Sequence, residues 1–400
     1  MSKFIYMDNA ATTAVRQEVV DAMVPYFTES YANPSSVYSF AQKTKNDMEE
    51  ARETIASILG AAKPNEIYFT GGGSESDNWA LKSAAFGLRN KGNHIITTKI
   101  EHHAILNTCA YLEKNGFEIT YLDVDSEGFV SLEDVENAIT EKTILISVMF
   151  ANNEIGTIEP VCEIGEIAHK HGILFHTDAV QAMCHVPINV TEMNIDLLSA
   201  SAHKFHGPKG VGFMYMKNSA KLEPFIHGGA QERARRAGTS NVPGIVGMGQ
   251  AVKLALSTLD KDTHTIINMR NYIVDRILGE IPDVTFDGPC IDANADVNAV
   301  SVGLPMCSLK RLPSNMHFCF KDVSGDSLLI MLDMNGICAS SGSACAAGSI
   351  DPSHVLLAIG RSKGETKGAL RLSIDKNLTK EDADYAIDAL KAAVARLRTK

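Results

Sequence analysis

The feature of this 400-residue chain that most restricts its fold is an alternation of apolar, β-branched runs with amphipathic stretches from about residue 15 to 217. The strand-like runs occupy residues 66–70, 94–97, 143–148, 173–177 and 196–199. The helix-like stretches between them include 74–90, 104–115 and 160–171. This pattern predicts an α/β fold with a mainly parallel sheet covered by helices. We therefore expect the functional site at the carboxyl ends of the strands.

The pattern changes after about residue 260. The later part of the chain has a long amphipathic stretch, two strand-like runs and two further helix-like stretches, at 261–280, 297–302, 315–320, 325–335 and 380–397. A chain this long exceeds the usual size of a single domain. We predict a large domain at 15–260, and a smaller α/β domain formed by 1–14 and 261–400.

Charge and hydropathy narrow the class of partners. The formal net charge is −11, which argues against nucleic acid held by bulk electrostatics. The chain contains no run of 18 uncharged apolar residues, and its start lacks a long apolar segment, so we expect neither a membrane span nor a secretory signal. These features favour a cytoplasmic protein.

The cysteine pattern indicates free thiols. The eight cysteines lie at 109, 162, 184, 290, 307, 319, 338 and 345, without a Cys-x-x-Cys pair or zinc-like spacing. We therefore predict no metal site. A chain of this size in a reducing compartment needs no disulfides, so we expect most of these thiols to be small buried groups.

A glycine-rich turn provides the first candidate binding site. Residues 71–74 (Gly-Gly-Gly-Ser) follow a strand-like run and begin a helix-like stretch, so the backbone N–H groups of Gly73 and Ser74 can face an anion. The alternative is a tight turn in which Ser74 only caps the helix.

Asp178 and Lys204 each follow a strand-like run, and neighbouring strands bring both to the same edge of the sheet. A lysine and an acid are what a pyridoxal cofactor requires, the first for a Schiff base and the second against the ring nitrogen. Ser201 and His203 flank Lys204 and can donate hydrogen bonds to a phosphate at Gly73 and Ser74. A lone lysine would otherwise be a solvated surface charge.

The segment 201–210 (Ser-Ala-His-Lys-Phe-His-Gly-Pro-Lys-Gly) resembles the cofactor-lysine region of fold-type I pyridoxal-phosphate enzymes, in particular the class V aminotransferase group. More narrowly, the chain resembles a cysteine desulfurase of the group that serves iron–sulfur cluster assembly. The resemblance extends nearly end to end, through residues 6–13, 33–36, 73–78, 101–103, 152–156 and 340–345.

The resemblance implies a seven-stranded-type sheet sandwiched by helices, and a role for each matching residue. Lys204 would hold pyridoxal 5'-phosphate as a Schiff base, and His102 would stack on its ring and transfer protons. Asn153 and Gln181 would lie near the ring hydroxyl. Thr239, in the loop 228–239, would contact the phosphate held by a partner subunit, which implies a homodimer.

The resemblance also implies sulfur chemistry at Cys345. This residue lies among small residues at 340–349, a composition typical of an exposed loop. Either the substrate adduct or a base such as His102 would have to generate its thiolate, and the sequence leaves both open. Arg371, within the apolar run 369–373, matches the position that binds the substrate carboxylate, and Asn33 is a second contact.

We therefore expect the conversion of L-cysteine to L-alanine, with a persulfide formed on Cys345. An acceptor protein such as an iron–sulfur scaffold would receive this sulfur for cluster assembly or tRNA thiolation, and a cluster would be bound transiently through Cys345 with the scaffold. The alternatives are another reaction of the same fold type, selenocysteine lysis or transamination, and a non-enzymatic sulfur carrier.

Overall fold

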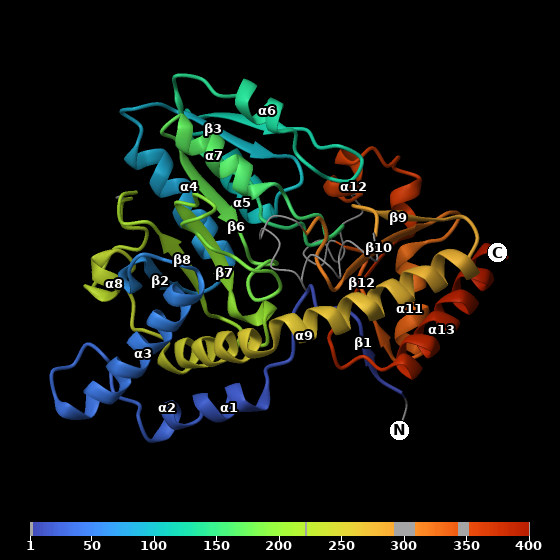
Figure 1. Ribbon diagram of the computed structural model, residues 1–400, viewed down its shortest axis with the longest axis horizontal. Helices are drawn as coiled ribbons and strands as arrows, with labels where there is room; N and C mark the ends of the chain where they lie inside the picture. Colours follow the sequence, from blue (N-terminus) through green and yellow to red (C-terminus); the bar gives the residue numbers. More distant parts are fainter. Residues whose placement is uncertain (1–2, 221, 292–308, 343–351, 400) are drawn as a thin grey trace.

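The computed structural model describes residues 3–220, 222–291, 309–342 and 352–399. Figure 1 shows two bodies of secondary structure side by side, with helix α9 (Val242–Glu280) running from one to the other. The N- and C-terminal ends of the chain both lie in the smaller body.

The larger body is built on a seven-stranded sheet in the order β2-β8-β7-β6-β5-β3-β4. Its strands are β2 (Ile67–Thr70), β3 (His94–Thr98), β4 (Glu118–Leu122), β5 (Thr143–Ser147), β6 (Leu174–Asp178), β7 (Leu197–Ser201) and β8 (Gly212–Met216). Strands β3 to β7 pair in parallel, and β8 runs antiparallel to both of its neighbours. This confirms the predicted α/β fold with a mainly parallel sheet.

The five predicted strands correspond to β2, β3, β5, β6 and β7 within two residues at each end. Strands β4 and β8 are absent from the predicted set. Strand β4 lies at the edge of the sheet and is only partly buried, so it lacks the apolar run that marked the central strands. Strand β8 follows Lys204 closely and joins the sheet in the antiparallel sense, outside the βαβ rhythm.

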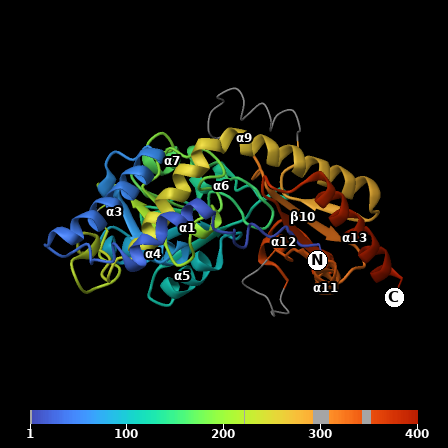
Figure 2. The same ribbon diagram turned by 90° about the horizontal axis from the view of Figure 1, so that it is seen from below.

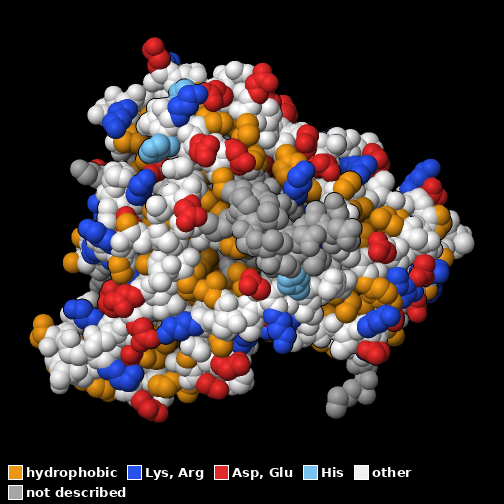
Figure 3. Space-filling model, in the orientation of Figure 1, with side chains coloured by type: hydrophobic (Ala, Val, Ile, Leu, Met, Phe, Trp, Pro, Cys, Tyr) orange, Lys and Arg blue, Asp and Glu red, His pale blue; other side chains and the backbone are white. Residues whose placement is uncertain are grey.

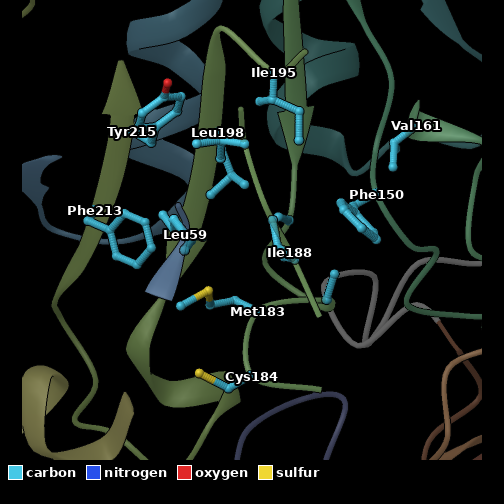
Figure 4. Close-up of a cluster of buried hydrophobic side chains, with 14 of the residues drawn as sticks. Leu59, Phe150, Val161, Met183, Cys184, Ile188, Ile195, Leu198, Phe213 and Tyr215 are labelled. Atoms are coloured by element: carbon cyan, nitrogen blue, oxygen red, sulfur yellow. The ribbon is translucent and has the colours of Figure 1, made fainter. Parts of the chain in front are cut away.

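Helices cover both faces of this sheet because consecutive strand residues point to opposite sides. Leu198 faces a core that includes residues of α3, α7 and α9, whereas the adjacent Leu197 faces a core that includes residues of α4 and α5. Figure 4 shows part of the first core, around Leu198 and Phe213. The helices and 3-10 turns of this body are α1 (Gln17–Met23), α2 (Pro25–Thr28), α3 (Ser39–Ile58), η1 (Pro64–Glu66), α4 (Gly73–Gly87), α5 (His103–Glu113), α6 (Leu132–Asn137), α7 (Val161–Lys170), η2 (Ala202–Lys204) and α8 (Gln231–Ala234).

The smaller body has its own apolar core. A three-stranded antiparallel sheet lies against this core in the order β12-β10-β9, with β9 (Val284–Asp287), β10 (Asn315–Phe320) and β12 (Ala369–Ser373). Two further short strands, β1 (Ile5–Tyr6) and β11 (Ile337–Cys338), pair in parallel. Its helical elements are α11 (Gly325–Met334), α12 (His354–Ala358), η4 (Glu365–Gly368) and α13 (Lys380–Arg398). The predicted strand at 315–320 and the helices near 325–335 and 380–397 are thus confirmed, and the strand at 297–302 lies outside the described residues.

Helix α9 joins the two bodies. Its first half places Ile245 and Met248 in the core on the large sheet, and its second half places Ile273 and Ile277 in the core of the smaller body. Figure 2 shows the helix lying along both. The predicted boundary at 260/261 falls inside this continuous helix, and the division into two domains stays a prediction. By length and composition alone α9 could cross a membrane, but its buried residues serve protein cores.

The described cysteines mostly match the expectation for free thiols. Cys109, Cys184 and Cys319 are buried, Cys338 is half-buried and Cys290 is exposed, all of them free. Cys162 is disulfide-bonded, so the expectation that the chain forms no disulfide is wrong there. On the face drawn in Figure 3, acidic and basic side chains are interspersed among apolar ones.

Leu198 provides a test of the core that supports the large sheet. Replacing this fully buried side chain by alanine should lower the free energy of unfolding by about 2–5 kcal/mol, through lost transfer energy and a residual cavity. Leu278→Ala is the matched control, because Leu278 on α9 is exposed and should change stability by less than about 0.5 kcal/mol. Urea unfolding of both variants measures the difference, and equal losses would contradict the assigned packing.

Candidate active site

A cavity of about 270 Å³ lies at the carboxyl ends of β6 and β7, beside the start of α4. It is lined by Ala10, Ala11, Gly73, Ser74, Asp77, Glu101, His102, His103, Met149, Ala151, Asn153, Glu154, Asp178, Val180, Gln181, Ser201, His203, Lys204, His354 and Arg371. Its position agrees with the edge of the sheet at which the sequence predicted a site.

Most of the predicted site residues meet in this cavity. They are Gly73, Ser74, His102, Asn153, Asp178, Gln181, Ser201, His203, Lys204 and Arg371. Asn33 and Thr239 are exposed and do not line it. The Asn33 side chain instead accepts a hydrogen bond from the Ser35 backbone N–H at 3.0 Å, so its substrate contact stays a prediction. Cys345 lies outside the described residues.

Lys204 enters the cavity from η2, the short turn that follows β7. Its Nζ donates to the carbonyl oxygens of Ala10 and Ala11 at 2.6 and 3.0 Å. The Gln181 side chain also donates to the Ala10 carbonyl, at 2.9 Å. The N-terminal segment therefore forms one wall of the cavity and orients both side chains.

The glycine-rich turn forms the anion-binding end of the cavity. Gly73 begins the 15-residue helix α4, whose first N–H groups have no acceptor within the helix. A Cβ atom on Gly73 would lie 2.5 Å from Cγ2 of Val180, so only glycine fits this close approach. Ser201 and His203 line the cavity beside this turn. Burial lowers the pKa of His203 to about 4, which leaves its ring neutral at neutral pH.

Asp178 and His102 form the charged part of the cavity. Asp178 ends β6, is buried, and accepts a hydrogen bond from the Val180 backbone N–H at 2.9 Å. Burial raises its pKa, whereas His102 and Lys204 lower it. His102 is the N-cap of α5, and its Nδ1 accepts from the Ala104 N–H at 3.1 Å, so the neutral ring carries its hydrogen on Nε2. Burial lowers the pKa of His102, and Asp178 raises it.

Arg371 reaches the cavity from β12 in the smaller body and is only 1% exposed. Its Nη1 donates to the carbonyl oxygens of Asn153 and Gly342 at 3.0 and 2.7 Å, and its Nη2 donates to Asp8 Oδ1 at 2.9 Å. Its Nε has no hydrogen-bond partner among the described residues. A buried guanidinium held in this way is suited to bind a carboxylate that enters the cavity.

Several polar residues of the cavity are not among the predicted site residues. Asp77, Glu101 and Glu154 line it from segments that carry the family resemblance, so those motifs could have identified them. His354 lines it from the first turn of α12, and its Nε2 contacts the Glu101 carbonyl at 2.9 Å. No motif pointed to His354, because it approaches the cavity only through the folding of the smaller body.

Comparisons with known proteins agree with this geometry. The aminotransferase class-V family model matches residues 5–386. The chain therefore belongs to the class-V aminotransferase family, in its cysteine desulfurase branch. A relative named cysteine desulfurase IscS from Clostridium botulinum is 53% identical over 398 residues, covering 100% of this chain and 96% of the relative. The cysteine desulfurase IscS of Methanosarcina thermophila is 50% identical, covering 99% and 93%.

Solved structures show the same fold. A NifS-like protein superposes with a TM-score of 0.88 at 36% identity, covering 98% of this chain and 100% of that one. A structure described as SspA in complex with cysteine superposes with a TM-score of 0.78 at 38% identity, covering 93% and 99%.

The close approach of Gly73 to Val180 can be tested by paired substitutions. Gly73→Ala should destabilise the protein by about 1–3 kcal/mol because the new methyl group overlaps Val180. The same change in a Val180→Ala background should cost less, since the overlapping methyl group is gone. Gly279→Ala is the control, because a Cβ there meets no atom within 4 Å. Thermal unfolding of the set measures the coupling, and simple additivity would argue against this contact.

Proposed function

We propose that the cavity binds pyridoxal 5'-phosphate, with Lys204 as the covalent attachment point. The observation that carries this proposal is the meeting of a lysine, a buried carboxyl group and a helix N-terminus in one cavity. The residues fit the group: the first N–H groups of α4, which begins at Gly73, can bind a phosphate, and the buried Asp178 carboxyl can hold a ring nitrogen in its protonated form. When bound, pyridoxal phosphate supplies an electron sink that labilises bonds at the α-carbon of an amino acid.

The remaining cavity residues are assigned by chemistry and position. Ser74, Ser201 and His203 offer hydrogen-bond donors at the phosphate end. Asn153 and Gln181 line the same cavity, which supports their proposed place beside the ring hydroxyl. Lys204 and His102 are the groups positioned to move protons, because both combine a titratable nitrogen with an ordered hydrogen-bond setting.

We infer that the substrate is L-cysteine and that the protein is a cysteine desulfurase. Arg371 would bind the substrate carboxylate, which places the α-carbon between Lys204 and the smaller body. The Cys345 thiolate would attack the substrate sulfur, forming an S–S bond while the carbon–sulfur bond breaks. The carbon left behind takes up a proton and leaves as L-alanine. The names of the relatives and the structure of SspA with cysteine support this assignment.

The persulfide on Cys345 would then pass to an acceptor protein. An iron–sulfur scaffold fits the name IscS carried by the relatives, and tRNA thiolation is the other route. A cluster bound transiently through Cys345 with such a scaffold, and a cytoplasmic location, belong to the same proposal. Selenocysteine lysis and transamination are the rival reactions of this fold type, and neither requires Cys345.

We propose a homodimer as the working form. Thr239 is exposed and does not line the cavity of its own chain, as expected of a residue that serves the partner's phosphate. Several large apolar side chains near the N-terminal helices are also exposed, namely Val20, Val24, Phe27, Tyr31, Val37, Tyr38 and Phe40. Apolar surface of this kind is expected at an interface between copies of the chain.

The sulfur acceptor can be tested by substitution. Cys345→Ser should lower sulfide release from L-cysteine, assayed without reductant, by more than about a hundredfold, because a serine hydroxyl is not a comparable nucleophile. The visible absorbance of the bound cofactor should remain in this variant and disappear in Lys204→Ala. Cys338→Ser is the matched control and should keep its activity. Sulfide release by Cys345→Ser at the wild-type rate would refute the acceptor assignment.

The role of Thr239 across the dimer can be tested with hybrid dimers. Lys204→Ala and Thr239→Asp homodimers should each bind little cofactor, the second because a carboxylate repels the phosphate. Mixed dimers of the two chains contain one site in which Lys204 and the partner's threonine are both intact. Their visible absorbance should therefore recover to about one cofactor per dimer, with dimer mass measured by sedimentation. No recovery would place Thr239 outside the partner's site.

A further inference from the structure

A second buried carboxyl group lies behind Asp178. Asp77, in the first turns of α4, is only 1% exposed. One carboxylate oxygen of Asp77, one of Asp178 and a ring nitrogen of His102 all lie within 4.8 Å of one another. Two buried carboxyl groups this close repel each other strongly when both are ionised, so one of them retains a proton.

The surroundings of Asp77 offer little support for a negative charge. Its Oδ1 is buried and has no hydrogen-bond partner among the described residues. The hydroxyl group of Ser199 bonds to the carboxyl group, and Nε2 of His176 lies 3.8 Å from Oδ1, beyond hydrogen-bond distance. Glu101, also buried, adds a further acidic group to the same region.

His176 does not supply a compensating positive charge. Its Nδ1 lies 2.9 Å from the Ser147 hydroxyl and its Nε2 lies 3.1 Å from the Ser199 hydroxyl, so two neutral groups occupy both ring nitrogens. Burial lowers the pKa of His176 to about 3, which keeps the ring neutral. The chain from Ser147 through His176 to Ser199 is therefore a buried network of neutral polar groups, and it supplies no positive charge to Asp77.

Asp178 is the better place for the charge. It accepts the Val180 N–H at 2.9 Å, and the neighbouring Lys204 and His102 lower its pKa and so favour its ionised form. Asp77 has the hydrogen bond of the Ser199 hydroxyl, but no positively charged group among the described residues lowers its pKa. Burial and the neighbouring Asp178 charge raise the pKa of Asp77 well above its ordinary value.

We propose that Asp77 is protonated in the native protein and acts as a positioning residue for Asp178, so that the two carboxyl groups carry a single negative charge that resides on Asp178. The O–H of Asp77 then offers a hydrogen-bond donor where a second carboxylate would repel. The claim that the Asp178 charge faces a ring nitrogen rests on the proposed function. The claim that Asp77 is protonated does not depend on that function.

This arrangement makes stability depend on pH in a defined direction. The groups that face Asp77 are Asp178 and His176 from β6, Ser199 from β7, and Glu101 and His102 from the segment just before α5. Because the pKa of Asp77 is higher in the folded than in the unfolded chain, its contribution to stability is complete below the ordinary aspartate range. This contribution is lost as the pH rises from the ordinary aspartate pKa to the pKa in the folded protein. Over that range the folding equilibrium constant falls by about tenfold per pH unit.

The test is infrared spectroscopy of the purified protein at neutral pH, combined with unfolding measured as a function of pH. The infrared difference spectrum, wild type minus Asp77→Asn, should contain the carbonyl stretching band of a protonated carboxylic acid. The free energy of unfolding of the variant should also depend less steeply on pH, by the amount that the titration of about one group contributes. Glu159→Gln is the matched control: Glu159 is another buried carboxyl group, with a pKa raised to about 8, but it does not line the cavity. This control should lose its own band and keep that of Asp77.

A second variant keeps the test decisive if Asp77→Asn folds poorly. In Asp178→Asn the band assigned to Asp77 should persist, because burial is the largest cause of the raised Asp77 pKa and remains when the Asp178 charge is removed. Loss of that band in Asp178→Asn, or its survival in Asp77→Asn, would overturn the proposal. If the purified protein instead fails to bind pyridoxal phosphate while the Asp77 band is present, the proposed function fails and this inference stands.

Discussion

The buried guanidinium of Arg371 is the interaction on which the geometry of the site depends most. It extends from β12 in the smaller body and donates to the Asn153 and Gly342 carbonyls and to the Asp8 carboxylate. Asp8 belongs to the N-terminal segment, Asn153 to the loop after β5, and Gly342 to the segment that follows β11. A buried cation without such partners would be costly, so the chain must bring these segments together to satisfy it. The cavity is thereby closed on the side of the smaller body.

Burial also determines the protonation states on the other side of the cavity. Loss of water raises the pKa of Asp178 and lowers the pKa of His102, while their mutual attraction acts in the opposite direction for each. The rings of His203 and His176 stay neutral because burial lowers their pKa values. The cavity thus concentrates its charge on a few groups and surrounds them with neutral donors, an arrangement suited to a charged, planar ligand.

Helix α9 explains how the two bodies hold a shared site. Its two halves contribute buried residues to separate apolar cores, so a single rigid element sets the position of β12 relative to the large sheet. Arg371 and Lys204 belong to different bodies, yet both line one cavity. A division of the chain at residue 260 follows the change in sequence pattern there. In the structure, however, α9 is continuous across this position.

The sequence by itself determined the alternation of strands and helices, the edge of the sheet at which the site lies, and half of the residues that line the cavity. Those features follow from local periodicity and from motifs whose spacing reports the ends of strands. Only the tertiary structure decided that β8 turns antiparallel, that His354 joins the site, and that Asn33 does not line the cavity of its own chain. The physical reason is that these outcomes depend on contacts between segments far apart in the chain, whose burial and mutual charge no local pattern records.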